Sequence, residues 1–72
     1  MPFIEIKIIE GEISKEETKE LVKDVTDAVV SHVGENLRGV VWVAVQEIKS
    51  GYFGVGGQAI GLEDIRAMQK GH

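Results

Sequence analysis

The chain has 72 residues, a formal net charge of -4 and no cysteine. The acidic balance offers no electrostatic footprint for nucleic acid or an anionic membrane, and the lack of cysteine excludes disulfides, thiolate metal sites and cysteine nucleophiles. His32 and His72 lie far apart, in a spacing that is not typical of a metal site, so we expect no bound metal.

A chain of this length forms one domain at most, and we expect a single domain over residues 1–72. Its core is marginal unless something supplements it, and partner subunits are the favoured supplement because disulfides and thiolate metal sites are excluded. No apolar run approaches the length of a membrane span, and the first residues lack the pattern of a secretory signal. We therefore expect a cytoplasmic protein.

Residues 2–10, PFIEIKIIE, alternate between two faces and predict a strand. One face of this strand is fully apolar and consists of Ile4, Ile6 and Ile8. The dipeptide EG then breaks the strand.

Residues 15–33 predict an amphipathic helix. Ser14 and Glu17 form a capping box at its start, and Gly34 is well placed to end it. The apolar stripe that we expect to be buried consists of Leu21, Val22, Val25, Ala28, Val29 and Val33. The next stretch, GENLRG, predicts a loop.

Residues 40–48, VVWVAVQEI, are almost continuously apolar and rich in β-branched side chains, which is typical of a parallel strand covered on both faces. A strand, a helix and a strand at this spacing predict a right-handed βαβ unit. Two strands and one helix leave one sheet face and both sheet edges uncovered. Pairing with a second copy of the chain would cover them.

The stretch SGYFGVGGQAIG predicts tight turns and a short hairpin. It also matches a dinucleotide fingerprint through Gly54, Gly56 and Ala59. That fingerprint requires a full helix, another strand and an acidic residue, which the following residues do not supply, so turn-forming glycines are the better interpretation. The last stretch, LEDIRAMQKGH, could form either a short helix or a frayed tail.

Pro2 is the candidate catalytic residue. Removal of Met1 would make its nitrogen a secondary amine, held by the strand that follows. Apolar surroundings would lower the pKa of this amine toward neutrality, so that it could act as a general base or form an iminium. An edge strand also tolerates proline at its first position, and from the residues alone this structural role is favoured. His32 and Trp42 are best interpreted as a helix-end residue and a packing residue.

Four stretches are similar to successive parts of one family. MPFIEIKIIEG matches a first strand and turn, KEETKELVKDVTDAVV a helix, VVWVAVQEI a second strand and GYFGVGGQ a glycine-rich hairpin. Together they resemble the 4-oxalocrotonate tautomerase family of the tautomerase superfamily over nearly the whole chain. The resemblance implies an α/β (α+β) fold, in which β-α-β protomers with a C-terminal β-hairpin pair into a four-stranded sheet backed by two helices, and three pairs form a hexamer.

The resemblance also implies a function. Pro2, freed of Met1, would be the base that moves a proton on an enol or dienol to give the ketone, and Phe53 would help form the apolar wall that keeps the amine neutral. No metal or organic cofactor is implied. The implied partners are a small-molecule substrate and further copies of the chain in a homohexamer, with a heterohexamer as an alternative, and neither nucleic acid nor membrane.

Two positions depart from the family's pattern. Members that act on dicarboxylates carry one arginine just after the first turn and another in the second strand, where this chain has Glu12 and Trp42. Neither side chain can imitate the bidentate fork of arginine, and a carboxylate would repel a dianion. Arg38 and Arg66 are candidate replacement cations. We therefore expect altered specificity, with Trp42, Glu12 and Arg38 among the substrate-binding residues.

Two alternatives stay open. A Glu12 close to Pro2 would favour the charged amine and could activate water, which is the logic of the hydratase and dehalogenase branches of the superfamily. Loss of both arginines also fits a non-catalytic partner subunit of a heterohexamer, and a retained Met1 would leave the nitrogen of Pro2 as an amide without basicity. The leading hypothesis is a tautomerase for small 2-hydroxydienoates or enolpyruvates, of the kind met in aromatic catabolism.

Overall fold

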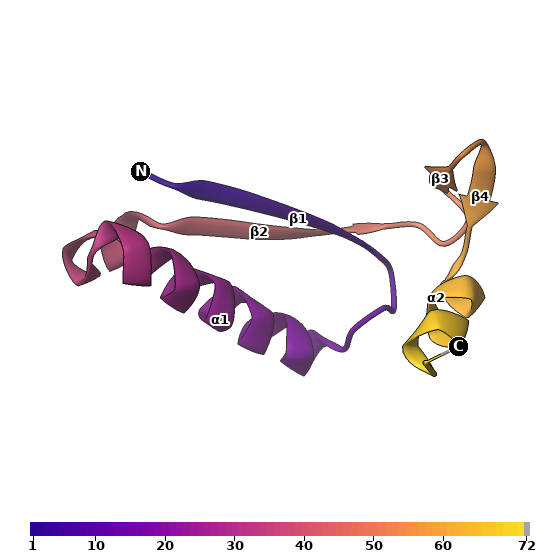
Figure 1. Ribbon diagram of the computed structural model, residues 1–72, viewed down its shortest axis with the longest axis horizontal. Helices are drawn as coiled ribbons and strands as arrows, with labels where there is room; N and C mark the ends of the chain where they lie inside the picture. The colour runs from indigo at the N-terminus through magenta and orange to yellow at the C-terminus, as the bar shows by residue number, and fades with distance from the viewer. Residues whose placement is uncertain (72) are drawn as a thin grey trace.

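The computed structural model describes residues 1–71 of the chain. The elements in chain order are β1 (Phe3–Ile9), α1 (Lys15–Val33), η1 (Glu35–Val40), β2 (Trp42–Ile48), β3 (Phe53–Val55), β4 (Gln58–Ile60) and α2 (Leu62–Gln69). Helix α1 runs beneath β1 and β2, while the β3–β4 hairpin and α2 lie beyond one end of these strands (Figure 1). The predicted mixed fold, a β-α-β arrangement followed by a hairpin, is confirmed.

Strands β1 and β2 pair in parallel over their full lengths, as the βαβ prediction requires. At one end of the ladder the Trp42 N–H donates to the Pro2 carbonyl at 2.9 Å, and at the other end the Glu10 N–H donates to the Ile48 carbonyl at 2.8 Å. The backbone of Pro2 is therefore tied to the second strand, although proline itself has no N–H to donate to the ladder.

The two faces of this small sheet differ in cover. The predicted alternation in β1 is confirmed, since Ile4, Ile6 and Ile8 share one face and are half-buried, whereas Phe3, Glu5 and Lys7 are exposed. Helix α1 covers only one face of the sheet (Figure 1). On the opposite side the rings of Phe3 and Trp42 meet edge to face, with centroids 6.1 Å apart, and each residue is still 58% exposed. The cover on both faces that the composition of β2 predicts is therefore not present within one chain.

Helix α1 begins and ends where the sequence predicts. The Glu17 N–H donates to Ser14 Oγ at 3.1 Å and the Ser14 N–H to Glu17 Oε1 at 2.8 Å, which completes the capping box. Gly34 ends the helix at a φ of 109°, a conformation that favours glycine. The predicted stripe was wrong at three positions: Val30, only 6% exposed, is the most buried residue of α1, whereas Ala28 and Val33 are exposed.

Two further boundaries differ from the prediction. The stretch predicted as a loop forms the 3₁₀ helix η1, because the Leu37 and Val41 N–H groups donate to carbonyls three residues earlier. Val40 belongs to that helix, so β2 begins at Trp42 and not at Val40.

The glycine-rich stretch forms the predicted hairpin. Gly56 and Gly57 are its two central residues, with φ of 58° and 86°, the pair of positive angles that suits a type I′ turn. The last stretch is the helix α2 and not a frayed tail. Within the described residues neither α-helix has the length and apolar content to cross a membrane.

Candidate functional site

Pro2 lies at the free end of β1. The residue is half-buried and its carbonyl is held by the Trp42 N–H, whereas Met1 is 80% exposed. While Met1 is attached, the nitrogen of Pro2 is a tertiary amide and has no basicity. Removal of Met1 would leave a secondary amine on a residue that the strand already fixes.

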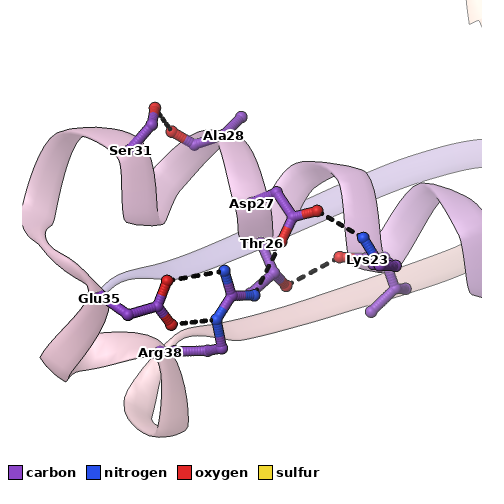
Figure 2. Close-up of polar contacts among 8 residues, drawn as sticks. Lys23, Thr26, Asp27, Ala28, Ser31, Glu35 and Arg38 are labelled. Carbon is purple, nitrogen blue, oxygen red and sulfur yellow. Dashed lines mark hydrogen bonds and ion pairs between the residues drawn. The ribbon is translucent and has the colours of Figure 1, made fainter.

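Arg38, predicted as a substrate-binding cation, is engaged by carboxylates (Figure 2). Its guanidinium contacts Glu35 through Nε and Nη2 and Asp27 through Nη1, the last at 2.8 Å. Asp27 also accepts from Lys23 Nζ at 2.7 Å. The hydrogen bonds from Lys23 and then Arg38 lower the pKa of Asp27, and the hydrogen bond from Arg38 lowers the pKa of Glu35. Arg38 would have to leave these carboxylates to bind a substrate.

Glu12 follows β1 at the end opposite Pro2. Its Oε1 accepts a hydrogen bond from the Ile9 N–H at 3.0 Å, and its own N–H donates to the Ile9 carbonyl at 3.0 Å. The carboxylate therefore closes the turn after the strand. Since a seven-residue strand is about 20 Å long, Glu12 and Pro2 of one chain do not meet.

Glu12 borders a hollow of about 320 Å³ at this end of the molecule. Phe53, Val55 and Ile60 of the hairpin form one side of it, and Ile65 and Met68 of α2 form another. The apolar side chain of Phe53 thus lines a hollow, but this hollow lies at the other end of the strands from Pro2, the residue that the family resemblance implies Phe53 should wall (Figure 1).

Arg66, the second candidate cation, fastens α2 to the turn after β1. Its Nη1 donates to the Glu12 carbonyl at 3.2 Å, and its Nη2 donates to the Gly11 carbonyl. Gln69 Nε2 donates to the same Glu12 carbonyl at 3.2 Å. These bonds give Arg66 a structural role within the chain.

The predicted site residues thus divide into two groups. Pro2, Trp42 and Arg38 lie toward one end of the sheet, and Glu12 and Phe53 lie toward the other (Figure 1). One chain does not bring the two groups together, and a single site containing both needs more than one copy.

The residues that the sequence interpretation missed are the apolar residues of α2. Leu62, Ile65 and Met68 recur every three positions, which was the available signal for one apolar helix face. The stretch was too short for this spacing to decide between a helix and a tail.

Among residues 1–71, no group of three or more histidine, aspartate or glutamate side chains is arranged to hold a metal ion. His32 is exposed in the last turn of α1, as the helix-end interpretation expects. His72 lies outside the described residues.

Comparison with known proteins gives one consistent family. The model of the family described as "Tautomerase enzyme" matches residues 2–63. A probable tautomerase of Staphylococcus aureus (SAV1363) is 42% identical over 57 residues, which is 79% of this chain and 90% of the relative.

Solved structures agree with this result. A putative 4-oxalocrotonate tautomerase from methicillin-resistant Staphylococcus aureus (SAR1376) is similar with a TM-score of 0.68 and 41% identity, covering 78% of this chain and 87% of that one. DmpI from Helicobacter pylori is similar with a TM-score of 0.71 and 30% identity, covering 82% and 95%. Most of α2 lies beyond the matched residues 2–63.

Proposed function

Because this chain belongs to the tautomerase family, we propose that it is an isomerase that interconverts the keto and enol forms of small 2-hydroxydienoates or enolpyruvates, with Pro2 as the general base. The observation that carries the proposal is the position of Pro2, which is the first residue of the family match and is tied to β2 by the Trp42 N–H. Residues 1–72 form one tautomerase-like domain in this proposal.

In the reaction the neutral amine of Pro2 accepts the proton of the enol hydroxyl. The charge that develops on oxygen spreads to the conjugated carbon, and the protonated amine returns the proton to that carbon. The proton leaves oxygen and arrives on carbon, so the product is the isomeric ketone and no co-reactant is consumed. The amine must be uncharged at the start, which apolar surroundings favour because they disfavour its charged form.

The proposal includes assembly, because Phe53 can wall the amine only if Pro2 comes from another copy. Pairing of chains through the open sheet face and edges would cover Phe3 and Trp42, and a homohexamer built as three pairs is the assembly that the family resemblance implies. Trp42 is the register partner of Phe3, the residue after Pro2, so in such an assembly it would lie beside the base, in line with its proposed substrate-binding role.

The test uses protein whose first residue is established by intact mass. Protein beginning at Pro2 should ketonise phenylenolpyruvate or a 2-hydroxydienoate, and Pro2→Ala should lower kcat/KM roughly 10²–10⁴-fold. The rate should rise with pH through the pKa of the amine. Protein that retains Met1 is the matched control and should be inactive. Equal rates for Pro2→Ala and the unchanged protein would refute the role of Pro2.

The two alternatives predict other results. Water activation by Glu12 requires a carboxylate near the amine and predicts halide release or hydration of an acetylenic acid that Glu12→Gln abolishes. Its present hydrogen bond to the Ile9 N–H gives this alternative less support than the tautomerase proposal. A non-catalytic subunit predicts a homomer without activity that becomes active when mixed with an arginine-bearing relative.

A further inference from the structure

The family match ends at residue 63, so it includes only the first two residues of helix α2. We infer that α2 is a wall of the substrate hollow, and that it makes the protein select monocarboxylate enols with an apolar substituent over dicarboxylates. This inference rests on the proposed function and names the substrate class of the same site. Three observations support it: the attachment of α2 to the rest of the chain, the apolar side chains of α2 that line the hollow, and the charged side chains beside them.

Helix α2 is fixed to the body of the protein at both ends. At its start the Leu62 N–H donates to Ser50 Oγ at 2.8 Å, and further along Arg66 and Gln69 donate to carbonyls of the turn after β1. The Leu62 side chain packs on Gly11 so closely that a Cβ there would lie 2.9 Å from Leu62 Cδ2. A segment held at several points can present its side chains in a defined place, which an untethered tail cannot do.

The side chains that α2 presents to the hollow are apolar. Ile65 and Met68 line it together with Phe53, Val55 and Ile60 of the hairpin. Met68 is 59% exposed in the single chain, so it has space to contact a ligand. A volume of about 320 Å³ lies within the usual range for small-molecule sites.

The charges at the hollow suit one carboxylate and not two. Lys7 lines it, and none of the ion pairs formed within residues 1–71 involves Lys7. Glu12 also lines it and is held there by the Ile9 N–H. One cation can pair with one substrate carboxylate, while the carboxylate of Glu12 repels a second one. The occupant that matches these features is a small monoanion with an apolar tail.

Binding of inert acids tests the inference without any catalysis. Isothermal titration of the assembled protein should show that 3-phenylpropanoate binds more tightly than adipate, a dicarboxylate of similar length. Met68→Ala should weaken 3-phenylpropanoate about tenfold, because it removes apolar contact in the hollow. Lys7→Met should weaken it about fivefold, as expected for a partly exposed ion pair.

Matched controls lie outside the hollow. Leu37→Ala, at an exposed position of η1, is the control for Met68→Ala, and Lys19→Met, on the exposed face of α1, is the control for Lys7→Met. Both should bind 3-phenylpropanoate as the unchanged protein does. Circular dichroism checks that α2 persists in each variant.

A charge introduced on α2 tests selectivity during turnover. Met68→Arg should move the ratio of kcat/KM for 2-hydroxymuconate over phenylenolpyruvate at least about tenfold toward the dicarboxylate, because it supplies a second cation. Pro2-dependent turnover with a ratio that Met68→Arg leaves unchanged would overturn the role of α2. Failure of 3-phenylpropanoate to bind would also overturn it. Dissociation of the oligomer by Met68→Arg in size-exclusion chromatography would do so too, because it would mean that a second copy occupies the hollow.

The two proposals fail separately. Binding of 3-phenylpropanoate that depends on Met68, in a protein that turns over neither enol, would reject the Pro2 chemistry and support the assignment of the hollow. Turnover that depends on Pro2 but not on Met68 would support the Pro2 chemistry and reject the assignment of the hollow.

Discussion

The strand–helix–strand part of the molecule and its C-terminal part, the β3–β4 hairpin with α2, are built in different ways. The first part buries Val30 of α1 and has a continuous parallel ladder, and Ile9, at the end of β1, is buried beside the hollow that the second part lines. The second part has no buried side chain within the described residues and leaves Phe53, Val55 and Met68 exposed. Its helix is attached by hydrogen bonds to Ser50 and to the turn after β1 and by the packing of Leu62 on Gly11. The first part therefore has a buried side chain under its own elements, whereas the apolar side chains of the second part stay exposed in the single chain.

This difference agrees with the distribution of the candidate site. Pro2 belongs to the part with the core, and Phe53 belongs to the part without one, at the opposite end of the strands (Figure 1). Because Pro2 and Phe53 lie at opposite ends of the strands, they can belong to one site only if they come from different chains. Function and assembly would then depend on the same surfaces.

The largest expected effect is the loss of stability when a buried valine is truncated, compared with the same truncation at an exposed valine. Val30→Ala should lower the free energy of unfolding by about 2 kcal/mol, because it leaves a cavity between α1 and the sheet. Val55→Ala, the same change in the hairpin, should cost less than about 0.5 kcal/mol because the side chain is exposed. Urea unfolding at one fixed protomer concentration measures both. Equal losses would show that the hairpin contributes as much core as α1.

A smaller effect is expected at the start of α1. Ser14→Ala removes the side-chain acceptor of the capping box and should cost about 1 kcal/mol. Ser31→Ala is the control, since Ser31 is exposed and its hydroxyl only donates to a carbonyl of the same helix. Urea unfolding should show little change for this control. A cost for Ser31→Ala as large as that for Ser14→Ala would contradict the importance of the cap.

Loss of the α2 attachment should have mainly a local effect. Arg66→Ala removes the donors to the Gly11 and Glu12 carbonyls, so the amides of α2 should exchange with solvent about fivefold faster. The amides of α1 should keep their protection, because α1 does not depend on these bonds. Hydrogen exchange measured by NMR separates the two helices. Equal acceleration in both would mean that the two parts unfold together.

The smallest expected effect is the pH dependence of the ion pairs around Arg38. The folded-state pKa values of Asp27 and Glu35 lie below their ordinary values, so these groups add stability above their unfolded pKa values near 4, which is lost as the pH falls through the folded values. Arg38→Met should reduce this loss. Thermal unfolding between pH 3 and pH 7 measures it, and an unchanged pH profile would contradict the contribution of Arg38.

Several local features of this protein follow from short stretches of its sequence. The capping box of Ser14 and Glu17 and the glycine at position 34 set the bounds of α1, the alternation in residues 2–10 set β1, and the two glycines at 56 and 57 set the hairpin. Each depends on residues within a few positions of one another, so the pattern is complete in the local sequence. The family resemblance was likewise readable because it rests on such stretches.

The remaining features depend on how the strands and helices pack. The tertiary structure buried Ile9 on the strand face that the alternation did not select, paired Arg38 with Asp27, docked α2 on the turn at Gly11 and Glu12, and separated Pro2 from Phe53. The contacts made by Arg38 and by α2 join residues 11 to 57 positions apart in the chain. No local periodicity encodes such contacts, because they form only when the strands and helices have packed.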